Sequence, residues 1–464
     1  MGLARWIPGA GLLLGAHFMT RALSFITAPY LARTLGPQAF GYWSFAQALS
    51  SYFSLPVDSG LSIVGTQKLA ESEKATGGIL IEVQILRILL AGVGAVGLLL
   101  AARLCPNPAL RSLVAAMGIV VVAGAINVEW ALRAREELGK VSLLQIGQSL
   151  LMVAGLLALV HSAKDLGRVP VVLGLTQMTV GALGACLALR HFFGRPGGSI
   201  FRRWPQLLRE GSVVASAGLA VTIYTNADIL MLQFLRLPHE VGAYAAAYRV
   251  QYLLLGVYGV FVGALLPQVA RAAKETRRIE FLLLVAKYLT VFGLLQGTTG
   301  FFAAPWMISI LYGSGYDLAT NALRILIWQM SVAYGNLMIA LLLLVMQRKH
   351  YAIGSWVGAV LNILLNLALI PRWGLHGSAI ATVAAEMAVA VYMLRTISRL
   401  VAIRAFLRAV APPIVLTLIF TGTAVAVGLP SGVAILAVPG SLVACLLFIR
   451  WGSHEELRLI LGIR

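Results

Sequence analysis

Three arginines lie inside long apolar segments, where a charged side chain is costly. Arg21 is about ten residues from the outer end of the apolar run 8–31, which at roughly 1.5 Å per residue places it near the middle of a membrane. Arg87 and Arg249 lie about two helical turns from the ends of two other apolar segments. A charge in hydrocarbon costs roughly 2.5–3.5 kcal/mol on insertion scales, so each arginine must face protein or water. Because guanidinium groups bind phosphate oxygens well, we predict a positively charged internal cavity that suits an anionic passenger.

Other polar residues accompany these arginines. His17 precedes Arg21 by four residues, so both side chains share one helix face. Another segment carries Tyr244, Tyr248 and Tyr252 at a spacing of four. These tyrosines either stack on sugar rings and hydrogen-bond through their hydroxyls, or pack against neighbouring helices. We predict substrate contacts for seven residues, namely Arg21, Arg87, Arg249, His17, Tyr248, Tyr252 and Asn226.

Further ionisable residues occur within apolar segments. Asp58, Asp228 and Glu386 either form structural ion pairs or bind a coupling ion. Lys287 and Arg324 lie so close to the ends of their segments that we expect their charged groups to extend to the membrane interface.

The composition is that of a membrane protein. Of the 464 residues, 59% are hydrophobic and only 11% are charged, and the mean hydropathy is +0.88. These values exclude a disordered chain, a coiled coil and a water-soluble enzyme. The three cysteines lack CxxC spacing, and the chain has no P-loop, HExxH or GxSxG pattern. We therefore expect no metal, no cofactor and no enzymatic activity.

About 14 apolar segments are long enough to cross a membrane, since a span needs roughly 20 apolar residues. The short separation of the last pair, and the end of the ninth span, which falls anywhere between Phe302 and Leu311, leave 12 or 13 spans open. The predicted transmembrane helices are 8–31, 40–64, 79–101, 112–131, 141–161, 170–190, 211–234, 242–270, 281–303, 321–346, 352–371, 375–393, 409–428 and 431–450.

The basic residues indicate how the chain crosses the membrane. With a cytoplasmic N-terminus, 24 of the 36 Lys and Arg residues fall in cytoplasmic segments and seven in outer segments. This asymmetry predicts an even number of spans with both termini in the cytoplasm. It also accounts for the net charge of +19 as a topology signal, so no nucleic-acid partner is expected.

The longest basic connection suggests two repeated halves. We predict an N-terminal six-helix lobe at 1–190, a cytoplasmic linker at 191–210, a second six-helix lobe at 211–395, and an extra helix pair with a tail at 396–464. The stretches "PQAFG" from Pro37 and "PHEVG" from Pro238 lie at equivalent places in the two halves, which favours a pseudo-two-fold relationship. The predicted fold is therefore an all-α polytopic membrane protein.

Three stretches resemble the polysaccharide transporters, which include the O-antigen and other lipid-linked oligosaccharide flippases of the multidrug/oligosaccharidyl-lipid/polysaccharide superfamily. They are "RALSFITAPYLARTLGPQAFGYWSFAQAL" from Arg21, "LYGSGYDLATNALRIL" from Leu311 and "LNILLNLALIPRWGLHGSAIATVAAE" from Leu361. The third is the most specific, and the likeness runs over nearly the whole chain. One departure is Gln67, where the family usually has Arg.

The resemblance implies a bacterial inner-membrane flippase that moves a polyprenyl-diphosphate-linked oligosaccharide to the outer leaflet by alternating access, with polysaccharide polymerase or glycosyltransferase partners. Two alternatives stay open within the superfamily: a peptidoglycan-precursor flippase and an ion-coupled multidrug exporter. An exporter of organic cations should place acidic residues in its cavity, whereas this chain places arginines in its apolar segments. A structural scaffold for glycan assembly is a further alternative.

Overall fold

The computed structural model describes residues 3–71, 76–189, 203–272, 276–398, 403–449 and 451–452. All regular elements in these ranges are helical. The chain divides into two compact units, which we call unit 1 (1–233) and unit 2 (234–464). Of the predicted linker at 191–210, residues 191–202 lie outside the described ranges.

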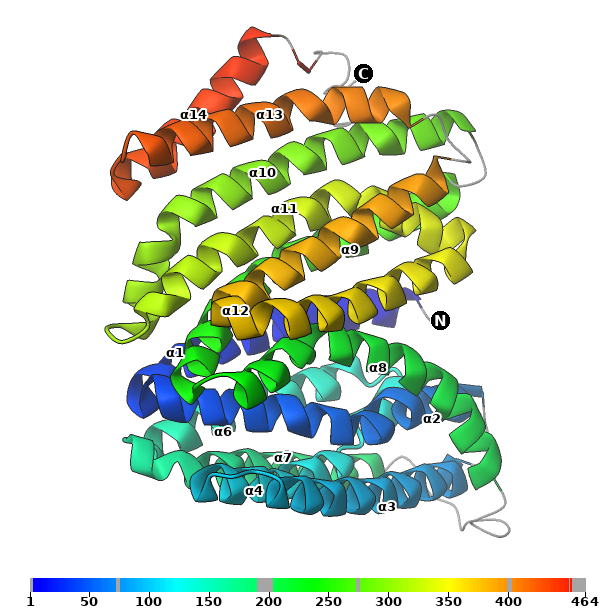
Figure 1. The fold of residues 1–464 in the computed structure, drawn as a ribbon. Helices are drawn as coiled ribbons and strands as arrows, with labels where there is room; N and C mark the ends of the chain where they lie inside the picture. The colour runs from blue at the N-terminus through cyan, green and yellow to red at the C-terminus, as the bar shows by residue number, and fades with distance from the viewer. Residues whose placement is uncertain are drawn as a thin grey trace. The chain divides into compact units, whose positions relative to one another are not determined.

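Unit 1 is built from helices that pack mainly on their neighbours in sequence. Figure 1 shows α3, α4 and α7 lying alongside one another. The helices are α1 (Leu3–Leu55), the π-helical turn η1 (Pro56–Gly60), α2 (Leu61–Glu71), α3 (Thr76–Arg103), α4 (Pro108–Ala125), α5 (Glu129–Ala134), α6 (Leu138–Leu159), the 3₁₀ turn η2 (Ala163–Gly167), α7 (Arg168–Leu189) and α8 (Trp204–Leu235), whose last residues fall in unit 2.

Unit 2 contains the two candidate membrane spans with the largest buried share among the described residues. In Figure 1, α13 lies along α10, which in turn packs on α11. The helices are α9 (Pro238–Ala272), α10 (Thr276–Tyr312), α11 (Asp317–Met346), α12 (Arg348–Ile397), α13 (Arg404–Ala426) and α14 (Ser431–Phe448).

Two helices bend at glycines that lie between predicted spans. The helix α12 carries both 352–371 and 375–393, whereas α1 carries 8–31 and the first part of 40–64, which continues through η1 into α2. Gly36 in α1 has φ +75° and Gly374 in α12 has φ +56°, a region that residues with a Cβ rarely adopt. At the second bend Arg236 donates to the main-chain oxygens of Ile370 and Pro371, both at 3.0 Å. These bonds satisfy carbonyl groups that the bend removes from the helical pattern.

The core of each unit is apolar and aromatic. In unit 1, Val83, Trp130 and Leu132 are among the buried side chains that α2, α3 and α5 bring together. In unit 2, the buried Tyr334 ring lies 5.1 Å from the ring of Phe292 and 5.5 Å from that of Tyr258. These edge-on contacts fix how α9, α10 and α11 pack.

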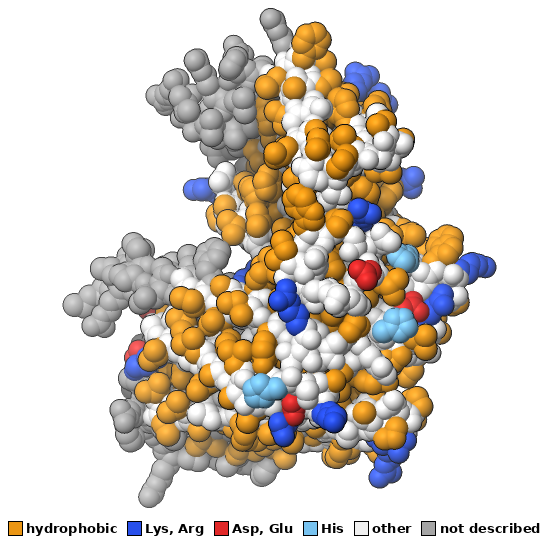
Figure 2. Space-filling model, turned by 90° about the vertical axis from the view of Figure 1, so that its left-hand side faces the viewer, with side chains coloured by type: hydrophobic (Ala, Val, Ile, Leu, Met, Phe, Trp, Pro, Cys, Tyr) orange, Lys and Arg blue, Asp and Glu red, His pale blue; other side chains and the backbone are white. Residues whose placement is uncertain are grey.

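The described surface is rich in apolar side chains. Figure 2 shows hydrophobic side chains spread over one face, with charged side chains singly or in small groups. Leu104, Leu436 and Phe448 are each at least 78% exposed. Within the described ranges, eleven helical segments are long and apolar enough to cross a membrane. The prediction of an all-α polytopic membrane protein is confirmed. The pseudo-two-fold stays a prediction.

The structure refines two predicted spans. The span 112–131 is interrupted, because α4 ends at Ala125 and the short helix α5 begins only at Glu129. The Asn127 Oδ1 atom accepts a hydrogen bond of 2.7 Å from the N–H of Glu129, the first residue of the new helix. The sequence leaves the end of the span 281–303 open between Phe302 and Leu311, and α10 runs from Thr276 to Tyr312, close to the longer alternative. The connection to α11 is therefore a tight turn that contains Gly313 and Gly315, both with positive φ.

Candidate functional site

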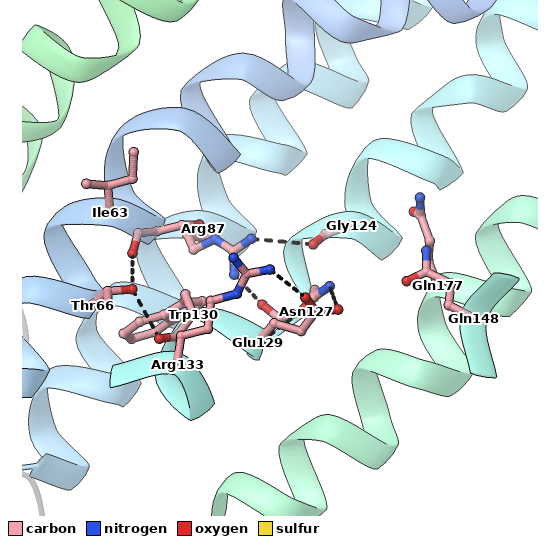
Figure 3. A pocket seen from close by; sticks show the side chains of 11 residues that line it. Ile63, Thr66, Arg87, Gly124, Asn127, Glu129, Trp130, Arg133, Gln148 and Gln177 are labelled. Carbon is pink, nitrogen blue, oxygen red and sulfur yellow. Dashed lines mark hydrogen bonds and ion pairs between the residues drawn. The ribbon is translucent and has the colours of Figure 1, made fainter. Parts of the chain in front are cut away.

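A polar cavity of about 420 Å³ lies within unit 1, where α4 is interrupted (Figure 3). Side chains from α2, α3, α5, α6 and α7 reach it, although these helices are otherwise mainly apolar. The lining residues are Ser62, Ile63, Thr66, Arg87, Gly124, Asn127, Glu129, Trp130, Arg133, Gln148 and Gln177.

Arg87 donates hydrogen bonds to main-chain oxygens at the break between α4 and α5. Its side chain is only 2% exposed. The Nε–H donates to the main-chain oxygen of Val57 at 3.2 Å, and Nη1 donates to the main-chain oxygen of Asn127. A longer bond of 3.5 Å joins Nη2 to the oxygen of Gly124 (Figure 3). Because a helix end leaves carbonyl groups without helical partners, these bonds explain how the break is accommodated inside an apolar unit.

Gln84 has a similar role one turn away on α3. Its Nε2 donates to the main-chain oxygen of Ala125 at 2.5 Å, and its Oε1 accepts from Arg87 at 3.4 Å. The sequence predicts that Arg87 faces polar surroundings. It does not reveal that main-chain oxygens supply much of those surroundings.

Glu129 is the acidic group of the cavity, with a side chain that is 13% exposed. It accepts hydrogen bonds from Gln145 Nε2 at 2.9 Å, Arg133 Nη2 at 3.3 Å and Asn127 Nδ2 at 3.3 Å. Three donors around one carboxylate fix its position. The Arg133 side chain remains 46% exposed, so it can also bind a ligand.

Of the other predicted site residues of unit 1, those with described side chains do not line the cavity. Arg21 is exposed on α1 and is not among the lining residues of the cavity. Asn226 on α8 donates to the main-chain oxygen of Thr222 at 3.2 Å, and Asp228 is 2% exposed. The side chains of His17 and Asp58 lie outside the described residues.

In unit 2 the predicted aromatic face is partly buried. The rings of Tyr244 and Tyr248 stack with centroids 6.0 Å apart, and the Tyr244 hydroxyl lies 3.3 Å from Thr382 Oγ1. Tyr252 is 55% exposed, whereas Arg249 is half-buried on the same helix. Helix packing therefore accounts for Tyr244, and the other two tyrosines keep accessible surface.

Two charged groups of unit 2 differ in their surroundings. Glu386 accepts a hydrogen bond of 3.3 Å from Gln329 Nε2 on α11. Lys287 is 7% exposed and donates to the main-chain oxygen of Trp451 at 2.9 Å, three residues after α14 ends at Phe448. Its extension to the membrane interface stays a prediction. Its ammonium group also lies 4.3 Å from the centre of the Trp451 ring, a cation–π contact.

Much of the cavity is lined by residues that carry no charge and that the sequence does not single out. Asn127, Gln148 and Gln177 are uncharged, so a search for buried charge passes over them. Glu129 lies near the end of a predicted span, where an acidic residue needs no special explanation. The available signal was the number of amide side chains within apolar segments, since amides also require partners there.

Comparison with known proteins identifies the family. The family model described as "Polysaccharide biosynthesis protein" matches residues 7–273. The chain belongs to this family. The match covers more than half of the chain and confirms the resemblance noted in the sequence.

Two curated proteins with similar sequences align with most of the chain. A protein of Escherichia coli (strain K12) named "Putative O-antigen transporter" is 23% identical over 407 residues, which cover 85% of this chain and 96% of that protein. The "Probable low-salt glycan biosynthesis flippase Agl15" of Haloferax volcanii is 21% identical over 376 residues, covering 79% of this chain and 78% of that protein.

Solved structures show the same fold. A structure titled "Lipid II flippase MurJ, inward closed conformation" aligns with a TM-score of 0.71 at 14% identity and covers 95% of this chain and 99% of that chain. An inward-facing multidrug resistance MATE family transporter of the MOP superfamily aligns with a TM-score of 0.63 at 16% identity, covering 86% and 99%. This polysaccharide biosynthesis protein therefore has the membrane-spanning fold of these transporters.

Proposed function

We propose that this protein is a flippase that moves a polyprenyl-diphosphate-linked oligosaccharide from the cytoplasmic to the outer leaflet by alternating access. The polar cavity inside apolar helices carries the proposal. Two arginines, one glutamate and three amides line it. Groups of this kind are costly in a membrane unless water or a polar ligand reaches them. The O-antigen transporter and glycan flippase among the relatives support a glycan as that ligand.

Positive charge along the route suits the diphosphate of such a substrate. We propose that Arg21 and Arg249 contribute this charge to the path of the diphosphate. Arg87 is proposed to contribute to substrate binding through its fixed place in the cavity wall. Contacts to the glycan are proposed for four residues, namely His17, Tyr248, Tyr252 and Asn226. An inside-negative membrane potential would favour outward movement of negative charge by about 2.3 kcal/mol per charge per 100 mV.

The same proposal implies a membrane, an orientation and protein partners. The protein would act in the bacterial inner membrane, with both termini in the cytoplasm and with polymerase or glycosyltransferase partners. Asp58, Asp228 and Glu386 are candidates for ion coupling or for charge pairing. No catalytic step is needed, since a flippase changes the side of the membrane on which its substrate lies and breaks no bond.

Direct translocation tests this function. Purified protein in proteoliposomes should move a fluorescent polyprenyl-diphosphate oligosaccharide between leaflets faster than protein-free vesicles do. The peptidoglycan-precursor flippase is the second candidate because the lipid II flippase fold aligns over 95% of this chain. Translocation of labelled lipid II with no movement of the oligosaccharide lipid would favour that candidate. Movement of organic cations alone would favour a multidrug exporter.

A further inference from the structure

The cavity of unit 1 presents donors and acceptors together. Arg133 supplies N–H donors, Glu129 supplies acceptors, and each of the three lining amides supplies both. A cavity wall with both donors and acceptors matches a ligand that carries many hydroxyl groups, since each hydroxyl both donates and accepts. The volume of about 420 Å³ falls within the range of roughly 300–1,000 Å³ that is usual for small-molecule sites.

A phosphate group fits this wall less well. The Arg87 guanidinium directs N–H groups at the main-chain oxygens of Val57, Asn127 and Gly124, so much of its donor capacity is already engaged. The carboxylate of Glu129 lies in the same wall and would repel a diphosphate.

Two lining residues each keep a buried polar atom that has no hydrogen-bond partner among the described residues. These atoms are Gln177 Oε1, an acceptor, and Trp130 Nε1, a donor. Buried polar groups in proteins are normally hydrogen-bonded, so such atoms call for a ligand or water. The Gln177 atom borders Gly124, because a Cβ added to that glycine would lie 3.6 Å from it.

We infer that this cavity binds one uncharged sugar ring of the transported oligosaccharide. Gln177 and Gln148 would bind its hydroxyls on one side, and Glu129 with Arg133 on the other. The inference rests on the proposed flippase function and adds which part of the substrate unit 1 recognises. The diphosphate would be bound outside this cavity.

Two substitutions probe the cavity without removing a charge. Gln177→Leu removes the amide at similar size. Gly124→Ala brings a methyl group into ordinary contact with Gln177 Oε1 and narrows the space beside it. Two matched controls lie outside the cavity lining. Gln233→Leu alters another glutamine whose buried Oε1 has no partner among the described residues, and Gly92→Ala adds a methyl group where nothing lies within 4 Å.

The four variants and the natural protein would be compared in proteoliposomes with two lipids. One is the labelled polyprenyl-diphosphate oligosaccharide, and the other is polyprenyl diphosphate without sugar, used as a competitor. Each cavity variant should raise the KM for the oligosaccharide lipid by about three- to tenfold, the effect of losing one or two hydrogen bonds. Inhibition by the sugar-free lipid should not change, and both controls should match the natural protein.

Two results would overturn the inference. The cavity variants could behave like their controls, or inhibition by the sugar-free lipid could weaken by the same factor, which would assign the cavity to the diphosphate. Titration calorimetry of the water-soluble oligosaccharide with the full chain separates the proposed sugar site from the proposed flippase function. If the natural protein binds it and Gln177→Leu does not, the cavity binds sugar even where no lipid is translocated. If neither lipid moves and no sugar binds, both proposals fail.

Discussion

Arg87 Nη1 donates a hydrogen bond to the main-chain oxygen of Asn127, across the interruption between α4 and α5. We predict that Arg87→Leu lowers the free energy of unfolding by about 3 kcal/mol, because several buried carbonyl groups lose their donor. Arg87→Lys should recover little, since one ammonium group cannot reproduce the planar fork. Thermal unfolding in detergent measures both variants. Arg209→Ala, at an exposed arginine of α8, is the control and should leave the midpoint unchanged.

The bend of α12 gives a second prediction. Gly374 has φ +56°, and a Cβ there would lie 2.3 Å from Glu240 Oε2, which also accepts a hydrogen bond of 3.3 Å from the Leu375 N–H. Gly374→Ala should therefore destabilise the protein by about 1–3 kcal/mol through backbone strain and the displaced carboxylate. Gly422→Ala in α13, where nothing lies within 4 Å, should be neutral or slightly stabilising. Equal unfolding midpoints for the two variants would contradict the role assigned to Gly374.

Arg21 tests the proposed path of the diphosphate. Arg21→Ala should abolish export of the polysaccharide in a complementation assay, whereas Arg21→Lys should retain part of it because the positive charge remains. Arg103→Ala, which removes an exposed charge at the end of α3, should leave export intact. Full export by Arg21→Ala at normal protein levels would remove Arg21 from the site.

The pair Lys68–Glu210 gives a prediction about pH. Lys68 Nζ lies 2.9 Å from Glu210 Oε2, and the hydrogen bonds from Lys68 and then Gln206 hold the pKa of Glu210 below its usual value of 4.5. A lowered pKa in the folded state means that the pair stabilises the fold above the ordinary glutamate pKa and is lost as the pH falls through the lowered value.

The corresponding measurement compares the natural protein with Glu210→Gln. At pH 7 the natural protein should unfold at a slightly higher temperature. The difference should shrink below about pH 4, and it should also shrink in 1 M salt, which screens exposed charges. A difference that is constant from pH 3 to pH 7 would show that the charge of Glu210 contributes nothing.

Much of the fold could be predicted from the sequence because membrane spans are a local property of the chain. The apolar segment 321–346 falls within α11, and 409–428 ends two residues after α13, since about 20 apolar residues in succession allow little but a helix in a membrane. The bend at Gly374 also lies between two predicted spans. The family was likewise readable from local motifs, such as the stretch from Leu361 to Glu386.

The cavity, and the hydrogen-bond partners of its polar residues, are decided by the tertiary structure. Arg87 was readable as a buried charge, but its contacts with Val57 and Asn127 join residues 30 and 40 positions away. Gln177 comes to the same cavity from a helix whose sequence is mainly apolar. Lys287 likewise reaches Trp451 across 164 positions. Hydropathy reports whether a segment can enter a membrane, whereas the partners of a buried polar group are set by packing between distant segments, which no local pattern records.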